Sequence, residues 1–391
     1  MSRMTLWSRM TAGFCLLALG ACDLPVTGGA GGPSVAPGET VRIAMLVPLG
    51  SGDTEREALS QSLVNAARLA ERDLQGVELD LTVYPTGAAD SSAAEIARTA
   101  LDEGADVILG PLFSTATAQV APVAAAADRT VLTLSNNPDV AGGNVYVLGN
   151  TFENTARRVV GYTASQGQRS LSVVHPQGAE GALAATAVRA AATANGVQVV
   201  HTGAYPLSVQ GITQSVPTIA QNLRGAGADT VILTDGPTGG LTFVAETLRG
   251  LGVRTGAVQF AGLQRWDVSA QAMAQPGLDG GWFAGPDRVL AAQFTNRYTA
   301  NYGTAPHPLA GLAYDGVAAI GALAAEASAA GQRDAFSAAR LTQASGFAGV
   351  MGIFRFRNDG LNDRALAVFE VRDGVAVQID PAPRSFGIGG T

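Results

Sequence analysis

The residues best suited to chemistry in this 391-residue chain are small polar side chains that follow short apolar runs. In Gly110-Pro-Leu-Phe-Ser-Thr115 such a run passes into a helical stretch, so the backbone N–H groups and the hydroxyls of Ser114 and Thr115 could hold a carboxylate. The alternative is that Ser114 only caps the helix. Ser51 and Gly52 occupy the equivalent turn after the first apolar run, with the same two interpretations.

Four further candidates follow later apolar runs. Ser135 and Asn136 could contact a ligand, although a plain Asx turn before Pro138 is the favoured interpretation. Tyr205 could stack on a ligand. Asp235 is either a ligand contact or, as we favour, a cap or turn residue. Together with the first group, these residues form the predicted ligand-binding set.

Other conspicuous residues favour structural roles. Phe152 and Trp266 are aromatic side chains of a kind found more often in a core than in a cleft. Asp315 lies in the middle of a helical stretch, where a helix-capping or interlobe hydrogen bond is favoured over ligand contact. His175 ends an apolar run and is favoured as a turn residue over a ligand contact.

Composition and spacing exclude several kinds of catalysis. All 25 basic residues are Arg, so the chain has no Lys for a Walker A motif, a Schiff base or a Ser–Lys dyad. His175, His201 and His307 lack metal-ligand spacing, and H-E-x-x-H, C-x-x-C and G-x-S-x-G do not occur. Nothing in the sequence pairs Glu153 with Asp267 for acid–base work. We therefore expect a protein that is not an enzyme and has no metal or cofactor.

The candidates require a frame in which many strands end at one edge of a sheet. From Val41 onward, short apolar runs alternate with Ala-rich helical stretches, which is typical of parallel sheets buried on both faces. This alternation predicts an α/β fold with two doubly wound, mostly parallel sheets flanked by helices. The expected strands are 41–47, 79–84, 105–109, 131–134, 144–148, 170–174, 198–201, 230–233, 352–356, 365–371 and 375–379. The expected helices are 54–74, 91–101, 114–127, 152–165, 178–195, 215–224, 239–251, 289–301 and 309–330.

The N-terminus has the features of a lipoprotein signal peptide. Two arginines precede the apolar stretch 11–20, which is too short to span a bilayer. Leu19-Gly-Ala-Cys22 resembles a bacterial lipobox, so we expect residues 1–21 to be removed and Cys22 to carry lipid; ordinary cleavage beside an incidental Cys22 is the alternative. Residues 22–40 would form a flexible Gly/Pro tether. We expect a location at the periplasmic face of the envelope and leave open which membrane holds the anchor.

Three motifs along the body resemble the type 1 periplasmic binding proteins, of the leucine/isoleucine/valine-binding kind. They are Ile43–Gly52 with Ser62–Ala70, Gly104–Ser114, and Leu312-Ala-Tyr-Asp-Gly316. This resemblance implies two interleaved lobes, expected at 41–149 plus 286–345 for lobe 1 and at 150–285 plus 346–383 for lobe 2, with a tail at 384–391. The implied hinge crossings lie near 149–151, 285–286 and 346.

Two later stretches resemble one branch of that family, the penicillin-binding-protein activators. They are Gln259–Asp267 followed by Gly280–Pro286, and Gly346–Phe356 followed by Arg364–Glu370. Such a resemblance implies a regulator of peptidoglycan synthesis that works with a peptidoglycan synthase. Activators of this type also have a helical-repeat domain before the binding-protein fold, where this sequence has only the tether.

Two non-catalytic functions therefore compete. The first is an activator-like regulator of peptidoglycan synthesis. The alternative is the solute-binding component of an ABC transporter for branched-chain or other amino acids, which would work with an ABC permease. The ligand would be an amino acid or a peptidoglycan fragment, and the family resemblance implies that Asp235 pairs with a ligand ammonium group. The net charge of −7 argues against nucleic acid as a partner, and membrane contact is expected through the lipid anchor only.

Overall fold

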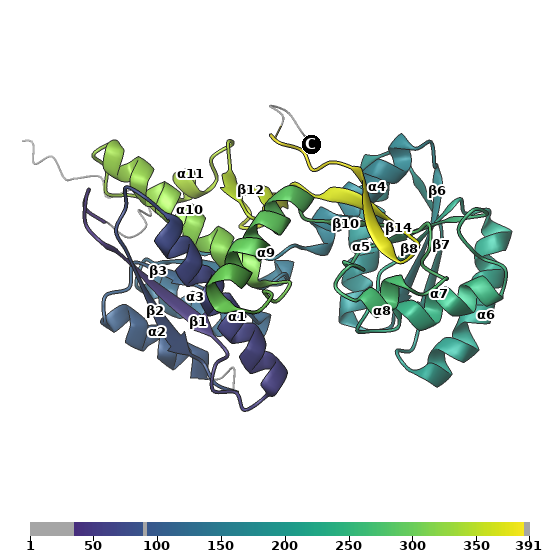
Figure 1. The fold of residues 1–391 in the computed structure, drawn as a ribbon, viewed down its shortest axis with the longest axis horizontal. Coiled ribbons are helices and arrows are strands. Elements are labelled where there is room, and N and C mark those ends of the chain that lie inside the picture. Colours follow the sequence, from purple (N-terminus) through teal and green to yellow (C-terminus); the bar gives the residue numbers. More distant parts are fainter. Residues whose placement is uncertain (1–34, 89–91, 387–391) are drawn as a thin grey trace, which may run out of the picture. The chain divides into compact units, whose positions relative to one another are not determined.

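The computed structural model describes residues 35–88 and 92–386 (Figure 1). The predicted signal peptide, Cys22 and most of the tether lie outside the described residues, as does the end of the predicted tail. Within the described part of the chain, no helix combines the length and the apolar character that crossing a membrane requires.

The first sheet has five parallel strands in the order β2-β1-β3-β4-β5. Along β1, the side chains of Ile43, Met45 and Val47 enter one core, whereas Ala44 and Leu46 enter a second core on the opposite face. This explains why the sequence of β1 is continuously apolar rather than alternating. The strands are β1 (Val41–Val47), β2 (Leu79–Pro85), β3 (Val107–Leu109), β4 (Thr130–Thr133) and β5 (Val145–Val147).

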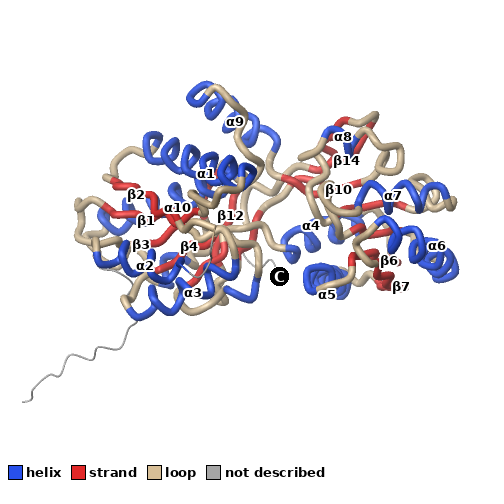
Figure 2. Tube along the Cα trace, turned by 90° about the horizontal axis from the view of Figure 1, so that it is seen from below, coloured by secondary structure: helices blue, strands red, loops and turns tan. Residues whose placement is uncertain are grey.

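Helices cover both faces of this first sheet (Figure 2). Helices α1 (Thr54–Asp73) and α10 (Ala310–Ala329) pack together on one face, with α9 (Arg288–Tyr302) beside α1, and α2 (Ala93–Asp102) packs with α3 (Ser114–Ala126) on the other. Close approach of α10 depends on its small residues: a Cβ on Gly316 would lie 2.6 Å from Leu109 Cδ1. Together these elements form lobe 1.

The second sheet has seven strands in the order β15-β14-β10-β9-β8-β6-β7. Strands β6 to β10 are parallel, and β14 and β15 add an antiparallel edge. The strands are β6 (Ser170–Pro176), β7 (Gln198–Tyr205), β8 (Thr230–Leu233), β9 (Gln259–Gly262), β10 (Trp282–Gly285), β14 (Ala367–Arg372) and β15 (Val375–Asp380). This sheet is the centre of lobe 2.

Helices also cover both faces of the second sheet. One core contains α4 (Phe152–Ser165) and α5 (Ala179–Ala194), and the other contains α6 (Val209–Ala226) and α7 (Leu241–Gly250), with the short α8 (Ala270–Met273) nearby. The two doubly wound sheets confirm the predicted fold class.

Because of a small third sheet, the chain returns to lobe 2 later than the sequence predicted. It consists of β11 (Phe347–Gly349), β12 (Gly352–Phe356) and β13 (Asn362–Arg364), and it follows the short helix α11 (Ala338–Leu341). We expected lobe 2 to resume at residue 346. Instead, Phe347, Phe354 and Phe356 are buried in the core of lobe 1, where their rings pack against one another. The third crossing therefore lies at Ala365–Leu366.

Two buried polar side chains of β13 hold this arrangement together. Arg364 Nη1 donates to Asp315 Oδ2 at 2.8 Å, and Arg364 Nη2 donates to the Leu148 carbonyl at 3.2 Å. Asn362 Nδ2 donates to the carbonyls of Val147 and Gly149 at 2.6 and 2.9 Å. Because Leu148 and Gly149 begin the first crossing, β13 fixes that crossing to the segment that leads into the third.

The Asp315–Arg364 ion pair is fully buried, with side-chain exposures of 0% and 1%. Asp315 Oδ1 also accepts from the Val350 N–H at 2.7 Å. Burial raises the pKa of the Asp315 carboxyl above its usual value even though Arg364 lies beside it. Asp315 thus has a structural role, as we favoured, but its partner is neither a helix end nor the other lobe: Asp315 of α10 accepts from Arg364 of β13, and both belong to lobe 1.

We expect the substitution Arg364→Leu to lower the free energy of unfolding by about 3–5 kcal/mol, because the Asp315 carboxylate would remain buried without its partner. Denaturant-induced unfolding at neutral pH measures this change. The double variant Asp315→Leu/Arg364→Leu is the control and should be more stable than the single variant, since it removes both charges. Parent-like stability of Arg364→Leu would contradict the role assigned to this pair.

Candidate functional site

A cavity of about 390 Å³ lies at the carboxyl ends of strands from both lobes. We call it the cleft cavity. Its lining includes residues of the loops that follow β3, β4 and β5 of lobe 1 and β8, β9 and β10 of lobe 2. This is the edge at which open α/β sheets bind ligands, because the strand-to-helix loops converge there. The volume falls within the usual range for small-molecule sites.

The wall of the cleft cavity is mainly apolar, with few polar groups. Asn136, Asn150 and Gln264 supply neutral amides, whereas Glu180, Arg265 and Arg364 are its charged members. Asn150 Nδ2 donates to Thr155 Oγ1 at 2.9 Å. The buried Asn150 Oδ1 has no hydrogen-bond partner among the described residues. The apolar lining residues are Leu59, Leu112, Phe113, Leu134, Phe152, Leu263, Val268, Ala284, Leu309, Leu312, Met351 and Leu366.

Beside the cleft cavity is a second depression of about 450 Å³, which we call the lobe 1 recess. Four predicted residues line it, namely Ser114, Thr115, Ser135 and Asn136. The structure thus brings together the loops after β3 and β4, as expected for neighbouring parallel strands. The recess shares Leu112, Phe113 and Asn136 with the cleft cavity, and its other lining residues are Arg56, Ala88 and Asn137.

The hydroxyl groups in the recess have different surroundings. Ser114 is the first residue of α3 and not its cap, because the N-cap position is taken by Phe113. Ser135 is buried, and its Oγ accepts from the Asn137 N–H at 3.1 Å. Ser135 therefore has the turn role that we favoured, although it also lines the recess.

Ser51 and Gly52 do not line either depression among the residues described. Their turn is occupied by the chain's own carboxylate, since Glu57 accepts from the N–H and Oγ of Ser51 and from the Gly52 N–H at 3.3 Å. Hydrogen bonds from the turn, with Gly50 first among them, lower the pKa of Glu57 below its usual value. The predicted anion-binding turn is thus filled internally.

Tyr205 and Asp235 bond to each other rather than facing the cleft cavity. The buried Tyr205 hydroxyl donates to Asp235 Oδ2 at 2.9 Å. Asp235 also accepts from the Gly236 and Gly240 N–H groups at 2.8 and 2.6 Å, just before α7. Burial, and then the adjacent Asp235 carboxylate, raises the pKa of the Tyr205 hydroxyl well above its usual range. These contacts match the cap or turn interpretation of Asp235.

The other conspicuous residues also have clear positions. Phe152 lines the cleft cavity, whereas Trp266 is fully buried in the lobe 2 core. His175 Nδ1 donates to the Pro176 carbonyl at 2.8 Å, as a turn residue would. Glu153 and Asp267 belong to separate ion pairs with arginines. Across the described chain, no group of His, Cys, Asp and Glu side chains could hold a metal ion.

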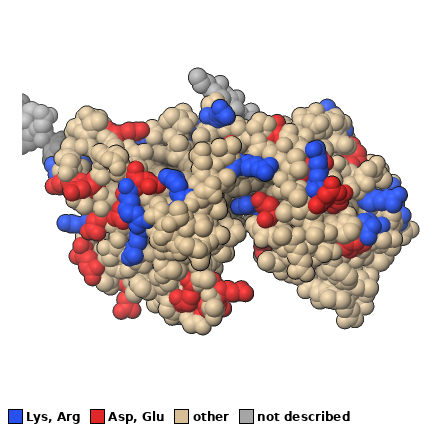
Figure 3. Space-filling model, in the orientation of Figure 1, with Lys and Arg blue, Asp and Glu red and all other residues tan. Residues whose placement is uncertain are grey.

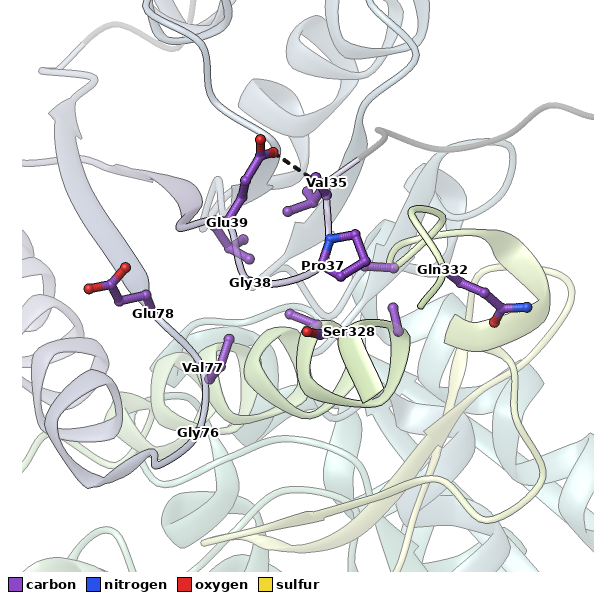
Figure 4. Close-up of a pocket in the computed structure, with 14 residues that line it drawn as sticks. Val35, Pro37, Gly38, Glu39, Gly76, Val77, Glu78, Ser328 and Gln332 are labelled. Atoms are coloured by element: carbon purple, nitrogen blue, oxygen red, sulfur yellow. Dashed lines mark hydrogen bonds between the residues drawn. The ribbon is translucent and has the colours of Figure 1, made fainter. Parts of the chain in front are cut away.

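Another depression, of about 340 Å³, lies where the described chain begins (Figure 4). It is formed by the turn at Val35–Glu39, the loop before β2 and the end of α10. The Glu39 carboxylate accepts from the Ala36 N–H at 3.1 Å, and the Thr40 hydroxyl donates to Glu78 at 3.0 Å. Because these carboxylates are bonded along the rim, this depression is less suited to a solute than the cleft cavity.

The surface carries charges of both signs. On the face drawn in Figure 3, basic and acidic side chains are interspersed, with wide uncharged areas between them. This distribution agrees with the modest net charge of −7.

The geometry agrees with comparisons to known proteins. A family model described as periplasmic binding protein matches residues 40–376. The chain belongs to this family. Its members are typically non-enzymatic ligand binders of the periplasm. The family match confirms the resemblance to the type 1, leucine-binding kind.

Solved structures of the same fold are similar to this chain at low identity. One is a branched-chain amino acid ABC transporter protein from Rhodospirillum rubrum, with a TM-score of 0.76 and 19% identity over 87% of this chain and 100% of that one. Another is an ABC transporter substrate-binding protein from Desulfitobacterium hafniense in complex with Leu, with a TM-score of 0.66 and 20% identity over 87% and 100%.

A third is an ABC transporter solute-binding protein from R. palustris in complex with benzoate, with a TM-score of 0.61 and 17% identity over 88% and 98% of the two chains. Among curated proteins no significant match to this chain is found. At these identities the structural matches show the fold alone, and they give no support to the activator branch.

We expect Asp235→Asn to lower the free energy of unfolding by about 1–3 kcal/mol while leaving solute affinity unchanged, because its contacts are internal to lobe 2. Denaturant unfolding and ligand titration on the same preparation separate the two effects. Tyr205→Phe removes only the hydroxyl that donates to Asp235 and is the control with the smaller expected loss of stability. Loss of solute affinity at unchanged stability would restore Asp235 as a ligand contact.

Proposed function

We propose that this protein is the solute-binding component of an ABC transporter, which binds a small organic molecule in the periplasm and presents it to a permease. The cleft cavity carries this proposal, because loops from the carboxyl ends of both sheets line it. Similar proteins named in the comparisons are transporter components, and two of them hold Leu and benzoate. The fold alone therefore leaves the chemical class of the solute open.

The cleft cavity is placed to couple binding to movement of the lobes. Gly149 and Asn150 of the first crossing, Gly285 and Pro286 of the second, and Leu366 of the third all line it. A solute that contacts these segments would favour whichever lobe arrangement gives it the most contacts, and a permease could distinguish that arrangement.

The motifs that resemble the activator branch have a packing explanation. In the first, a Cβ on Gly262 would lie 2.3 Å from Trp266 Nε1, and a Cβ on Gly281 would lie 2.5 Å from the same indole ring. In the second, Phe354 and Phe356 fill the core of lobe 1. These residues maintain the two cores and do not form an exposed surface for a peptidoglycan synthase.

We further propose that Cys22 carries lipid, which would keep the protein at the membrane that contains the permease. The lipobox-like sequence Leu19-Gly-Ala-Cys22 supports this assignment. Several acyl chains on one residue give stable anchoring, unlike a single chain.

We expect thermal unfolding of the purified protein to shift with a solute drawn from amino acids, other small carboxylates and peptidoglycan fragments. A ligand at 100 times its Kd stabilises the folded state by about 2.7 kcal/mol, which raises Tm on the order of a few degrees. Thr238→Trp, at an exposed lining position, should abolish the shift by filling the cleft cavity.

Thr193→Trp is the matched control, because Thr193 is exposed near the end of α5 and is not among the lining residues. The control should retain the full shift. If no small solute changes Tm, and a peptidoglycan synthase is instead retained by the immobilised protein, the transporter function is wrong and the activator function takes its place.

A further inference from the structure

We propose that a cluster of ion pairs behind the crossings is a salt-sensitive latch, which holds the lobes in the arrangement of this structure and opposes closure of the cleft cavity. We call this cluster the hinge latch. It consists of Glu153, Arg157, Arg355, Arg357 and Asp363. The inference rests on the proposed function only in assuming that the lobes close.

The hinge latch borders a groove of about 730 Å³, which we call the hinge-side groove. On helix α4, Phe152 and Thr155 line the cleft cavity, whereas Asn154 and Arg157 line the hinge-side groove. Residues three apart share a face of a helix, so the two hollows adjoin different faces of α4. Leu366 of the third crossing lines both hollows. The crossings therefore form a wall between them, and a rotation about this wall that narrows the cleft cavity widens the hinge-side groove.

The hinge latch joins the two lobes. Arg157 Nη1 donates to Asp363 Oδ1 at 2.7 Å, and Arg357 Nη1 donates to Glu153 Oε1 at 2.6 Å. Arg157 and Glu153 belong to α4 of lobe 2, whereas Asp363 lies on β13 and Arg357 directly follows β12, both in the third sheet of lobe 1. Arg157 also pairs with Glu153, and Arg355 pairs with Asp363. Each of these two carboxylates therefore lies between two guanidinium groups, one from each lobe.

The hinge latch is placed so that closure breaks it. Arg157 is about 9 Å along the helix axis from Thr151, the N-cap of α4 in the first crossing. A rotation of about 20° about that crossing would move Arg157 by about 3 Å, which separates an ion pair. The latch side chains have exposures between 12% and 41%, so dissolved salt screens their charges.

A second contact crosses the same groove. Ala382 is buried in the lobe 2 core, and four residues later the Phe386 ring centroid lies 4.8 Å from the guanidinium carbon of Arg355. Figure 1 shows this last part of the described chain, in yellow, leading from the second sheet toward β12. Four residues span at most about 13–14 Å, so Phe386 cannot follow a widening groove far. Its contact with Arg355 opposes closure in the same way as the ion pairs.

The latch has a consequence for solute binding. The apparent affinity of a solute is reduced by the fraction of molecules that have the binding-competent arrangement. Because salt weakens the latch, it should increase that fraction. Solute binding should therefore strengthen as salt rises, which is the opposite of the effect of salt on an exposed ion pair between solute and protein.

Disulfide trapping in the purified protein tests the latch without any solute. Thr238→Cys and Leu309→Cys place thiols at exposed positions on the lobe 2 and lobe 1 walls of the cleft cavity, and Cys15→Ser and Cys22→Ser remove the natural thiols. Two cysteines join only when their Cα atoms come within about 7 Å of each other. With oxidised glutathione as the oxidant, the rate of disulfide formation follows the fraction of closed molecules, even when that fraction is small.

We expect Arg157→Gln to speed trapping by about 2- to 30-fold, because it removes two ion pairs that each contribute about 1.4- to 5-fold. Raising the salt from about 0.05 M to about 1 M should also speed trapping in the protein with an intact latch. The Arg157→Gln variant should respond less to salt. The salt measurement needs no substitution in the latch, so it holds even if the variant folds poorly.

Arg249→Gln is the matched control, because Arg249 and Glu246 form a comparably exposed ion pair within α7 of lobe 2. It should be trapped at the parent rate. Glutathionylation rates of the two single-cysteine variants correct for effects of salt on the thiol chemistry. Equal trapping of the parent and Arg157→Gln at low salt, or a corrected parent rate that does not rise with salt, would overturn the inference. The proposed function would survive both results, because it is tested by the thermal screen and no solute enters this measurement.

Discussion

The buried ion pair between Asp315 and Arg364 is the contact that fixes β13, and with it the start of the third crossing, to the core of lobe 1. Asp315 belongs to α10, which packs on the first sheet, and Arg364 ends β13, directly before the chain returns to the second sheet. Two charges are placed in a dry interior only at a considerable desolvation cost, so their value lies in specifying one geometry more than in adding stability. Arg364 also stacks on Phe354, with its guanidinium carbon 4.8 Å from the ring centroid, which fixes β13 against β12.

The organisation of the fold could be predicted from the sequence because most strands are buried on both faces. Apolar runs such as Val41–Val47, Thr230–Leu233 and Gly352–Phe356 have the bounds that the structure shows. Gln259–Gly262 and Trp282–Gly285 were not predicted as strands, since both are short and end in glycine. The lobe to which the third sheet belongs was also predicted wrongly. Alternating phenylalanines indicate that a strand is buried, but they do not indicate which of the two cores contains it.

The site could be predicted in part. The rule that parallel strands share a carboxyl edge brought Ser114, Thr115, Ser135 and Asn136 to one recess. It could not show that Glu57, from the following helix, occupies the turn at Ser51, or that Tyr205 and Asp235 satisfy each other across the sheet. Those outcomes depend on side-chain directions that spacing does not encode.

The position of Asn362 has a mechanical consequence. Its amide nitrogen bonds to the carbonyls of Val147 and Gly149, and its oxygen accepts from Asn154 Nδ2 at 2.7 Å, at the start of α4. The linkers at 149–151 and 365–366 are therefore both tied to Asn362, so that bending one of them disturbs the hydrogen bonds of the other. With those two acting as a single pivot, Gly285–Pro286 is the one other covalent connection between the lobes in the described chain, and two pivots define a line. Relative rotation of the lobes would then be confined to one axis through these two pivots. The strength of the solute contacts would set the angle of closure but not its direction.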